Sequence, residues 1–143
     1  MRALLDVNVL IALLDAGHVM HRSATAWLER EIQHGWASCP ITENGVVRIM
    51  SQPSYPASRP APMVAARLAE ACRHPAHAFW PEDVSVLQPG LIEWSGILGH
   101  RQVTDAYLLA LAVRHGGRLA TFDRRIAVDV VPGAQAASLV IIA

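Results

Sequence analysis

The sequence predicts a three-layer α/β domain, in which helices cover both faces of a central parallel sheet. The first observation is the start of the chain, where apolar residues 3–5 are followed directly by Asp6 and then by an apolar helical stretch at 9–14. A short strand that is apolar on both faces is typical of a parallel sheet covered by helices. The second observation is that strand and acid recur near the end, where Asp123 follows the predicted strand 118–122.

The other elements are predicted in order from apolar periodicity and from the residues that end helices and strands. Gly35 and Gly116-Gly117 are typical helix ends, and Pro40 ends a strand. Amphipathic or apolar helical patterns predict helices over 22–33, 41–50, 63–72 and 104–113. Short apolar or β-branched runs predict strands over 36–39, 78–80, 118–122 and 139–142. Residues 81–94 show no period, and no element is predicted there.

Length and composition favour one globular domain, 1–143, that buries its own core. The chain is 52% hydrophobic, with twelve basic and twelve acidic residues and a formal net charge of zero. All basic residues are Arg, yet there is no basic tail, so net charge gives no support to nucleic-acid binding. Cys39 and Cys72 have no motif spacing and suit a reducing compartment. No convincing signal peptide and no apolar run of about 18 residues is found, so a cytoplasmic protein without a membrane segment is expected.

Four acids share one kind of position in the predicted fold. Asp6 and Asp123 follow strands, whereas Glu43 and Asp105 lie at the starts of helices. The carboxyl ends of parallel strands and the N-termini of the following helices lie at the same edge of a sheet, which is also where ligands bind. We therefore expect the four carboxylates to converge.

Each acid taken singly also has an ordinary structural explanation. Asp6 suits an N-cap, and Glu43 is favoured by the helix dipole. Thr104 is a natural N-cap that would place Asp105 in the first helical turn. Together, however, the acids would repel by roughly 4 kcal/mol per close pair at an effective dielectric near 20. A cation would relieve this repulsion, and hard oxygen ligands suit Mg²⁺ or Mn²⁺.

Four segments, taken together and in this order, resemble the PIN-domain family, and within it the VapC toxins of bacterial toxin–antitoxin pairs. The matching segments are LLDVNVL at 4–10, TENG at 42–45, TDAYLLALA at 104–112 and LATFDRR at 119–125. Each segment is weak evidence alone, but the set spans most of the chain. The resemblance implies a PIN-like fold with about five short parallel strands flanked by helices.

The same resemblance implies a function and a set of site residues. It implies a Mg²⁺- or Mn²⁺-dependent endoribonuclease that cleaves RNA phosphodiesters, forms dimers and is inhibited by a cognate VapB-like antitoxin. Asp6, Glu43, Asp105 and Asp123 match the catalytic acidic quartet. Metal would lie between Asp6, Asp105 and Asp123, with Glu43 acting directly or through water. Three polar residues would support the acids: Asn8, Thr104 and Thr121.

Two other functions remain open beside the ribonuclease. One is a catalytically silent PIN module with an RNA-binding or regulatory role. The intact quartet argues against this alternative, because a carboxylate cluster without a function would only cost stability. The other is a phosphohydrolase with an aspartyl nucleophile, which also begins with an acid after a strand. That class normally has a second Asp two residues later and a catalytic Lys, whereas this chain has Asn8 there and no Lys.

Several further residues could contact ligands. His18 with His21, and His74 with His77, have close spacing but no thiolates at zinc-finger spacing, so surface or capping roles are preferred to zinc. Three arginines are candidates for contacts with RNA phosphates, with solvated surface equally plausible for each: Arg48, Arg101 and Arg124. An inhibitory antitoxin segment is expected to place an Arg or Lys among the acids and an apolar face against helix 22–33 or the region of Arg48.

Overall fold

A five-stranded, fully parallel sheet forms the centre of the computed structural model, which describes residues 1–143. Its strand order is β3-β2-β1-β4-β5, so β1 lies in the middle. Ala3 pairs with Trp36 on one side and with Arg118 on the other. The predicted α/β class and parallel sheet are confirmed. The strands are β1 Ala3–Leu5, β2 Trp36–Ser38, β3 His77–Phe79, β4 Arg118–Thr121 and β5 Leu139–Ile141.

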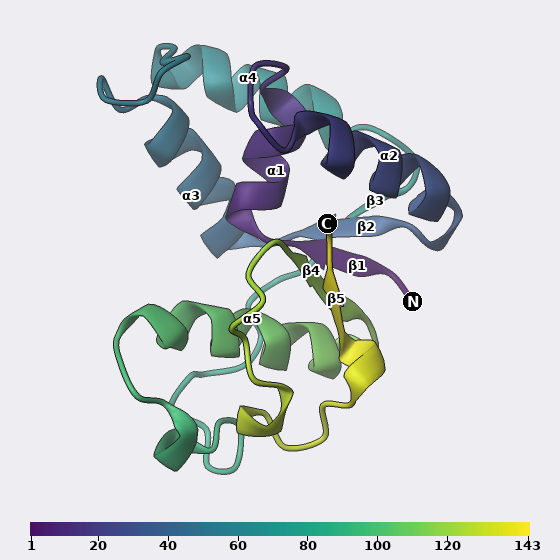
Figure 1. Ribbon diagram of the computed structural model, residues 1–143, viewed down its shortest axis with the longest axis vertical. Helices are drawn as coiled ribbons and strands as arrows, with labels where there is room; N and C mark the ends of the chain where they lie inside the picture. The colour runs from purple at the N-terminus through teal and green to yellow at the C-terminus, as the bar shows by residue number, and fades with distance from the viewer.

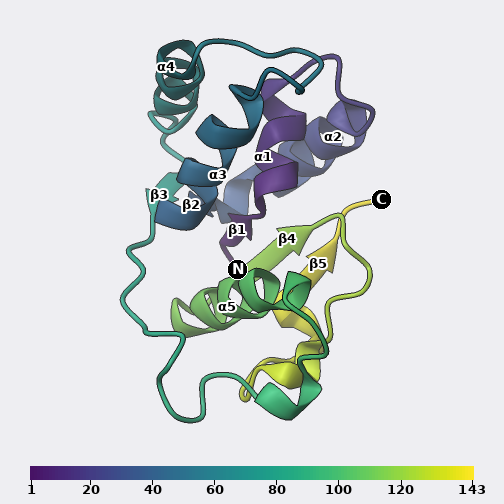
Figure 2. The ribbon, with the colours of Figure 1, turned by 90° about the vertical axis from the view of Figure 1, so that its left-hand side faces the viewer.

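Helices cover both faces of the sheet, as Figures 1 and 2 show. On one face lie α1 Val7–Leu14, α2 His21–Glu31, α3 Pro40–Met50 and α4 Ala61–Ala71. The other face is covered by α5 Arg101–Arg114 and by the segments around it. No helix is both long and apolar enough to cross a bilayer.

The apolar strands divide their side chains between two cores. Leu4 and Leu119 pack with α5, whereas Leu5 and Ala120 pack with α1 to α4. Alternating residues of a strand point to opposite faces, and both faces are covered here, so continuous apolar strands are required. This arrangement places the carboxyl end of every strand along one edge, beside the N-termini of α1, α3 and α5 (Figure 1).

The start of α5 differs from the sequence prediction. The helix begins at Arg101, and Thr104 is an exposed residue of its first turns instead of the N-cap. Asp105 consequently lies beyond the first turn. The side-chain carbonyl of Gln102 accepts hydrogen bonds from the backbone N–H groups of Leu98 and Gly99, which stabilises an earlier helix start. The predicted capping role of Thr104 is therefore wrong.

Candidate active site

Asp6 ends β1 and caps α1, and it belongs to both elements. Its carboxylate accepts hydrogen bonds from the Val7 N–H at 2.8 Å and from Thr121 Oγ1 at 2.8 Å. The residue is only 9% exposed. Burial raises the pKa of Asp6, and the nearby charge of Asp123 adds to this effect, although both hydrogen bonds oppose it. Asp6 is thus an N-cap, and it also lies next to a second acid.

Thr121 connects two of the acids. It is fully buried at the end of β4, where its hydroxyl donates to Asp6 and accepts the backbone N–H of Asp123 at 3.1 Å. Adjacent parallel strands β1 and β4 bring these residues together from opposite ends of the chain. The orientation of the Asp6 carboxylate therefore depends on a residue 115 positions away.

Asp105 projects from α5 toward the other two aspartates. Its pKa is raised to about 6, first by burial and then by the charges of Asp6 and Asp123, against a smaller opposing effect of Arg125. The three aspartates lie in one cluster, because Thr121 joins Asp6 to Asp123 and because Asp105 and Asp123 line the same hollow, although their oxygens do not all lie within 4.8 Å of one another. Three hard carboxylates supplied by different elements are donors that Mg²⁺ and Mn²⁺ accept.

Arg125 is a site residue that the sequence interpretation did not select. Its Nε lies 3.0 Å from Asp123 Oδ1, and its terminal nitrogen lies 3.2 Å from Asp123 Oδ2. These charge-assisted contacts lower the pKa of Asp123, in contrast to the raised values of Asp6 and Asp105. The sequence shows two arginines after Asp123, but only the folded loop shows that Arg125, and not Arg124, binds the Asp123 carboxylate.

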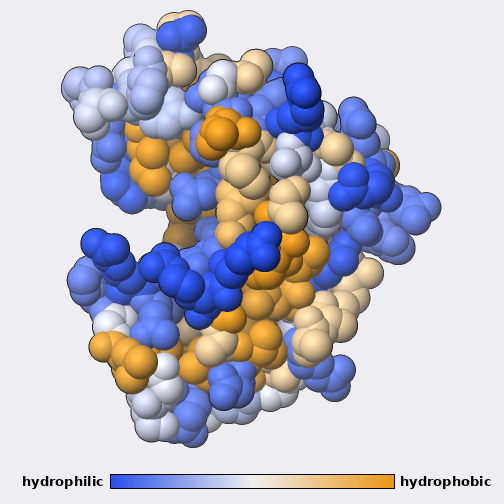
Figure 3. Space-filling view, in the orientation of Figure 1, coloured by the Kyte–Doolittle hydropathy of each residue, from blue (hydrophilic) through white to orange (hydrophobic).

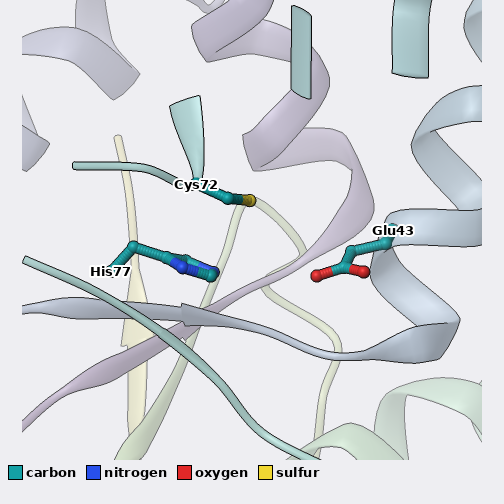
Figure 4. A group of neighbouring side chains, drawn as sticks. All are labelled: Glu43, Cys72 and His77. Carbon is teal, nitrogen blue, oxygen red and sulfur yellow. The ribbon is translucent and has the colours of Figure 1, made fainter. Parts of the chain in front are cut away.

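Glu43 lies in the first turn of α3, as predicted, but faces other partners. Its carboxylate accepts a hydrogen bond of 2.6 Å from Ser38 Oγ. Cys72 and His77 face the Glu43 carboxylate (Figure 4), and Ser38 Oγ contacts both of them. Glu43 does not line the hollow shared by Asp105 and Asp123, and it lines a separate cavity with Cys72 and His77. The structure thus clusters three members of the predicted quartet and turns the fourth toward a neighbouring group.

A hollow of about 230 Å³ opens beside the aspartates. Its charged lining comes from Arg101, Asp105, Asp123 and Arg125, and apolar residues such as Ile97 complete it. Figure 3 shows this side of the molecule indented between the half with α1 to α4 and the half with α5, with strongly hydrophilic residues along the lower rim. Of the three arginines predicted to contact RNA, only Arg101 lines this hollow.

The other predicted polar residues lie at the surface. Asn8 is exposed in the first turn of α1, next to the capping Asp6. Arg48 on α3 and Arg124 after β4 are also exposed. None of the three has a hydrogen-bond or ion-pair partner that fixes its side chain, so each is free to contact a ligand.

Comparisons with known proteins agree with this architecture. Residues 3–129 match the PIN domain family. The chain is 54% identical over 134 residues to Ribonuclease VapC44 of Mycobacterium tuberculosis, covering 94% of each protein. It is 46% identical over 128 residues to Ribonuclease VapC39 of the same species, covering 89% of this chain and 92% of the relative.

A solved structure supports the fold independently. The crystal structure of VapBC2 from Rickettsia felis bound to a DNA fragment from their promoter superposes with a TM-score of 0.67, covering 100% of both chains at 13% identity. At that identity the likeness concerns the fold alone. The match of residues 3–129 and the extensive identity to the curated relatives decide the family. This chain belongs to the PIN-domain family, and within it to the VapC-type toxins.

Proposed function

We propose that this chain is a Mg²⁺- or Mn²⁺-dependent endoribonuclease toxin that cleaves RNA phosphodiesters. The observation that carries the proposal is the cluster of Asp6, Asp105 and Asp123 at the carboxyl edge of the sheet: Thr121 bonds both Asp6 and the backbone of Asp123, and Asp105 and Asp123 line one hollow. Two of the relatives above are named ribonucleases, which supports the same reaction class. An unneeded cluster of this kind would only cost stability, which disfavours a silent RNA-binding module.

The residues of the cluster have separate roles in this proposal. Asp6, Asp105 and Asp123 would hold the metal, and Glu43 would act on it directly or through water. When bound, the ion would orient the phosphodiester and make a water molecule more acidic. Thr121 fixes the direction of the Asp6 carboxylate, because its hydroxyl donates to it. Asn8 and Thr104 lie exposed near the cluster and would contact water or RNA.

Arginines at the rim supply the contacts for the RNA backbone. Arg101 lines the hollow beside Asp105, and Arg125 lies in the same hollow. Guanidinium groups bind phosphate with a planar fork of donors. Arg48 and Arg124 would extend this contact along the surface. Arg125 would release Asp123 when the metal binds, and its charge would then be available to a phosphate.

A VapB-like antitoxin is the proposed partner, and a homodimer in the cytoplasm is the proposed form of the toxin. The solved relative from Rickettsia felis is a VapBC pair, which supports such a partner. An inhibitory segment would insert an Arg or Lys among the three aspartates, where it replaces the charge of the metal.

The test is cleavage of a structured RNA by the purified full-length chain with Mg²⁺, with Mn²⁺ and with a chelator. We expect cleavage only with metal, and a loss of at least about 100-fold in Asp105→Asn. Asp83→Asn is the matched control, because Asp83 pairs with Arg114 and His115 outside the cluster.

Three outcomes would contradict the proposal. Metal-independent cleavage would remove the role of the cluster. RNA binding without cleavage under every metal would favour the silent module, and release of phosphate from small phosphomonoesters alone would favour the phosphohydrolase.

A further inference from the structure

A second group of potential metal ligands lies beside the aspartate cluster. Glu43 comes from α3, Cys72 is the C-cap of α4, and His77 begins β3. One carboxylate oxygen, the thiol sulfur and one imidazole nitrogen all lie within 4.8 Å of one another. Figure 4 shows the three side chains pointing into a common space. The aspartates, in contrast, do not form so tight a group.

We propose that Glu43, Cys72 and His77 bind a Zn²⁺ ion. Zinc accepts sulfur, nitrogen and oxygen ligands together, at about 2.3 Å for sulfur and about 2.0–2.2 Å for the lighter atoms. Ligands around a tetrahedral ion of that size lie closer together than 4.8 Å, so only a small contraction of flexible side chains is needed. Mg²⁺ prefers oxygen ligands, so this set distinguishes zinc from the metal of the aspartates.

Ser38 pre-organises two of the ligands. Its Oγ donates to Glu43 at 2.6 Å and lies 2.8 Å from His77 Nε2, and the residue is 0% exposed. This burial excludes Ser38 as a nucleophile for an external substrate. Ser38 is a positioning residue that holds the carboxylate and imidazole on the same side of β2. Ser38 gives its one hydroxyl hydrogen to Glu43, so the Nε2–H of His77 donates to Ser38 Oγ. When zinc binds, the imidazole proton moves from Nε2 to Nδ1, zinc replaces Ser38 as the partner of Nε2, and the Cys72 thiol releases its proton to solvent.

The ligands are accessible from outside. All three line an open cavity of about 700 Å³ between α3, α4 and β3, together with Asn44 and Arg73. Three protein ligands leave a fourth position for water, as in zinc sites with an open position. The sequence interpretation set His77 aside because no zinc-finger spacing surrounds it. The structure supplies the missing sulfur ligand from the free cysteine Cys72 and the acid from α3.

Zinc at this site has a regulatory consequence, which rests on the proposed function. Glu43 would then be a ligand of the zinc ion, together with Cys72 and His77, and would be unavailable to the aspartate cluster. Zinc would therefore inhibit metal-dependent RNA cleavage without displacing the ion at Asp6, Asp105 and Asp123. Inhibition by zinc and activation by magnesium would therefore both depend on Glu43.

The binding test uses the full-length protein with Co²⁺ as a spectroscopic substitute for Zn²⁺. We expect a thiolate-to-cobalt charge-transfer band in the wild type that zinc abolishes. Zinc affinity, measured by competition with a chelating dye, should fall by at least about 10- to 100-fold in Cys72→Ser and in His77→Gln. Cys39→Ser and His74→Gln are matched controls, since Cys39 and His74 lie outside the group.

The two proposals fail in different ways. Absence of the charge-transfer band, or unchanged zinc affinity in Cys72→Ser, would overturn the zinc site whatever the cleavage assay gives. Zinc binding in a protein that cleaves no RNA would uphold the site and end the ribonuclease proposal. If both activities exist, micromolar zinc should inhibit the wild type but not Cys72→Ser; equal inhibition of both would overturn the regulatory consequence.

Discussion

Asp105 is the residue whose environment most clearly reflects the cluster. Its pKa of about 6 lies well above the ordinary 3.8, because burial and two like charges disfavour the carboxylate. A carboxyl group that titrates higher in the folded than in the unfolded chain binds more protons when folded. In the window between about pH 4 and pH 6, stability therefore falls as pH rises, because the folded protein loses the favourable neutral form.

This sign gives the first prediction. Without divalent metal, the free energy of unfolding of the wild type should fall between about pH 4 and pH 6, and that of Asp105→Asn should fall less. The stability of the variant relative to the wild type should therefore increase as pH rises. Urea unfolding in chelator at a series of pH values measures the difference. Asp83→Asn is the control. Desolvation raises the pKa of Asp83, but its backbone hydrogen bond and the neighbouring His115 and Arg114 outweigh this and lower it below 3.8, so this group titrates below the window and its variant should keep a constant difference from wild type across it. A constant difference between wild type and Asp105→Asn across the window would contradict the prediction.

The second prediction concerns Asp6. Asp6→Asn removes a buried charge that burial and Asp123 disfavour, and Asn still caps α1. The Thr121 hydroxyl loses its charged acceptor, which costs about 1 kcal/mol and partly offsets the gain. We expect a net gain of about 1 kcal/mol at pH 7.5 in chelator, or about 3 °C in melting temperature, together with loss of RNA cleavage.

Thermal unfolding at two pH values separates the causes in Asp6→Asn. The gain should shrink near pH 4, where protonation neutralises the wild-type carboxyl. A lower melting temperature than wild type at pH 7.5 would show that the hydrogen bonds of the carboxylate outweigh its repulsion.

At the scale of elements, the close approach of α1 and α3 determines where two of the acids lie. Asp6 precedes α1 and Glu43 lies on α3. The helices meet at Gly45, where an added Cβ would lie 2.8 Å from Cγ2 of Val7. Val7 is β-branched and its side chain is stiff, so it cannot easily turn away. Gly45 is therefore required by packing, despite the lower helix propensity of glycine.

Gly45→Ala should consequently destabilise the fold. Overpacking costs about 1–3 kcal/mol, and the better helix propensity of alanine returns up to about 1 kcal/mol. We expect a net loss of about 1 kcal/mol in urea unfolding. Gly99→Ala is the control, since no atom lies within 4 Å of its added Cβ, and it should change stability by less than about 0.5 kcal/mol. A Gly45→Ala protein more stable than wild type would mean that α1 and α3 separate freely.

At the scale of the whole molecule, the aspartates lie at the junction of two halves. One half contains α1 to α4 and the other contains α5 and the C-terminal segments, and the surface is indented between them (Figure 3). The hollow itself is lined entirely by residues 97–130 of the second half. A ligand in the hollow therefore contacts the half with α5, and it contacts the other half only where it also reaches Asp6, the N-cap of α1. An apolar groove formed by α1, α2 and α4 lies elsewhere, lined by Leu14, Leu28 and Leu68 among others. The sequence predicted that the partner would pack against helix 22–33 or the region of Arg48. In the structure, α2 forms this groove with α1 and α4, and Arg48 on α3 does not line it.

Hydrogen exchange with a co-expressed VapB-like protein tests the proposed mode of inhibition. Occupation of the cluster predicts protection at the start of α5 and in the loop after β4, which line the hollow on both sides of Asp105 and Asp123. Protection of α2 is expected in addition, where the apolar face of the partner would lie. Protection confined to α4 would show that the antitoxin does not inhibit by occupying the cluster.

The sequence alone determined the α/β class, the parallel sheet and the positions of the four acids along the chain. These features follow from local patterns: apolar strands, helical periodicity and acids directly after strands. The resemblance to PIN domains identified the four acids, in their order along the chain, as one quartet and added the expected chemistry. Helix and strand ends were less well determined, as the earlier start of α5 shows, because end residues depend on loop hydrogen bonds such as those of Gln102.

Only the tertiary structure decided where the side chains of these acids point. Thr121 reaches Asp6 because β4 pairs with β1, and Arg125 reaches Asp123 because of the turn after β4. Glu43 faces Ser38, Cys72 and His77 because α3, α4 and β3 meet beside it. Such contacts join residues that are far apart in the sequence, and no local period encodes them. The sequence therefore located the acids at one edge, and long-range packing divided them between two groups of side chains.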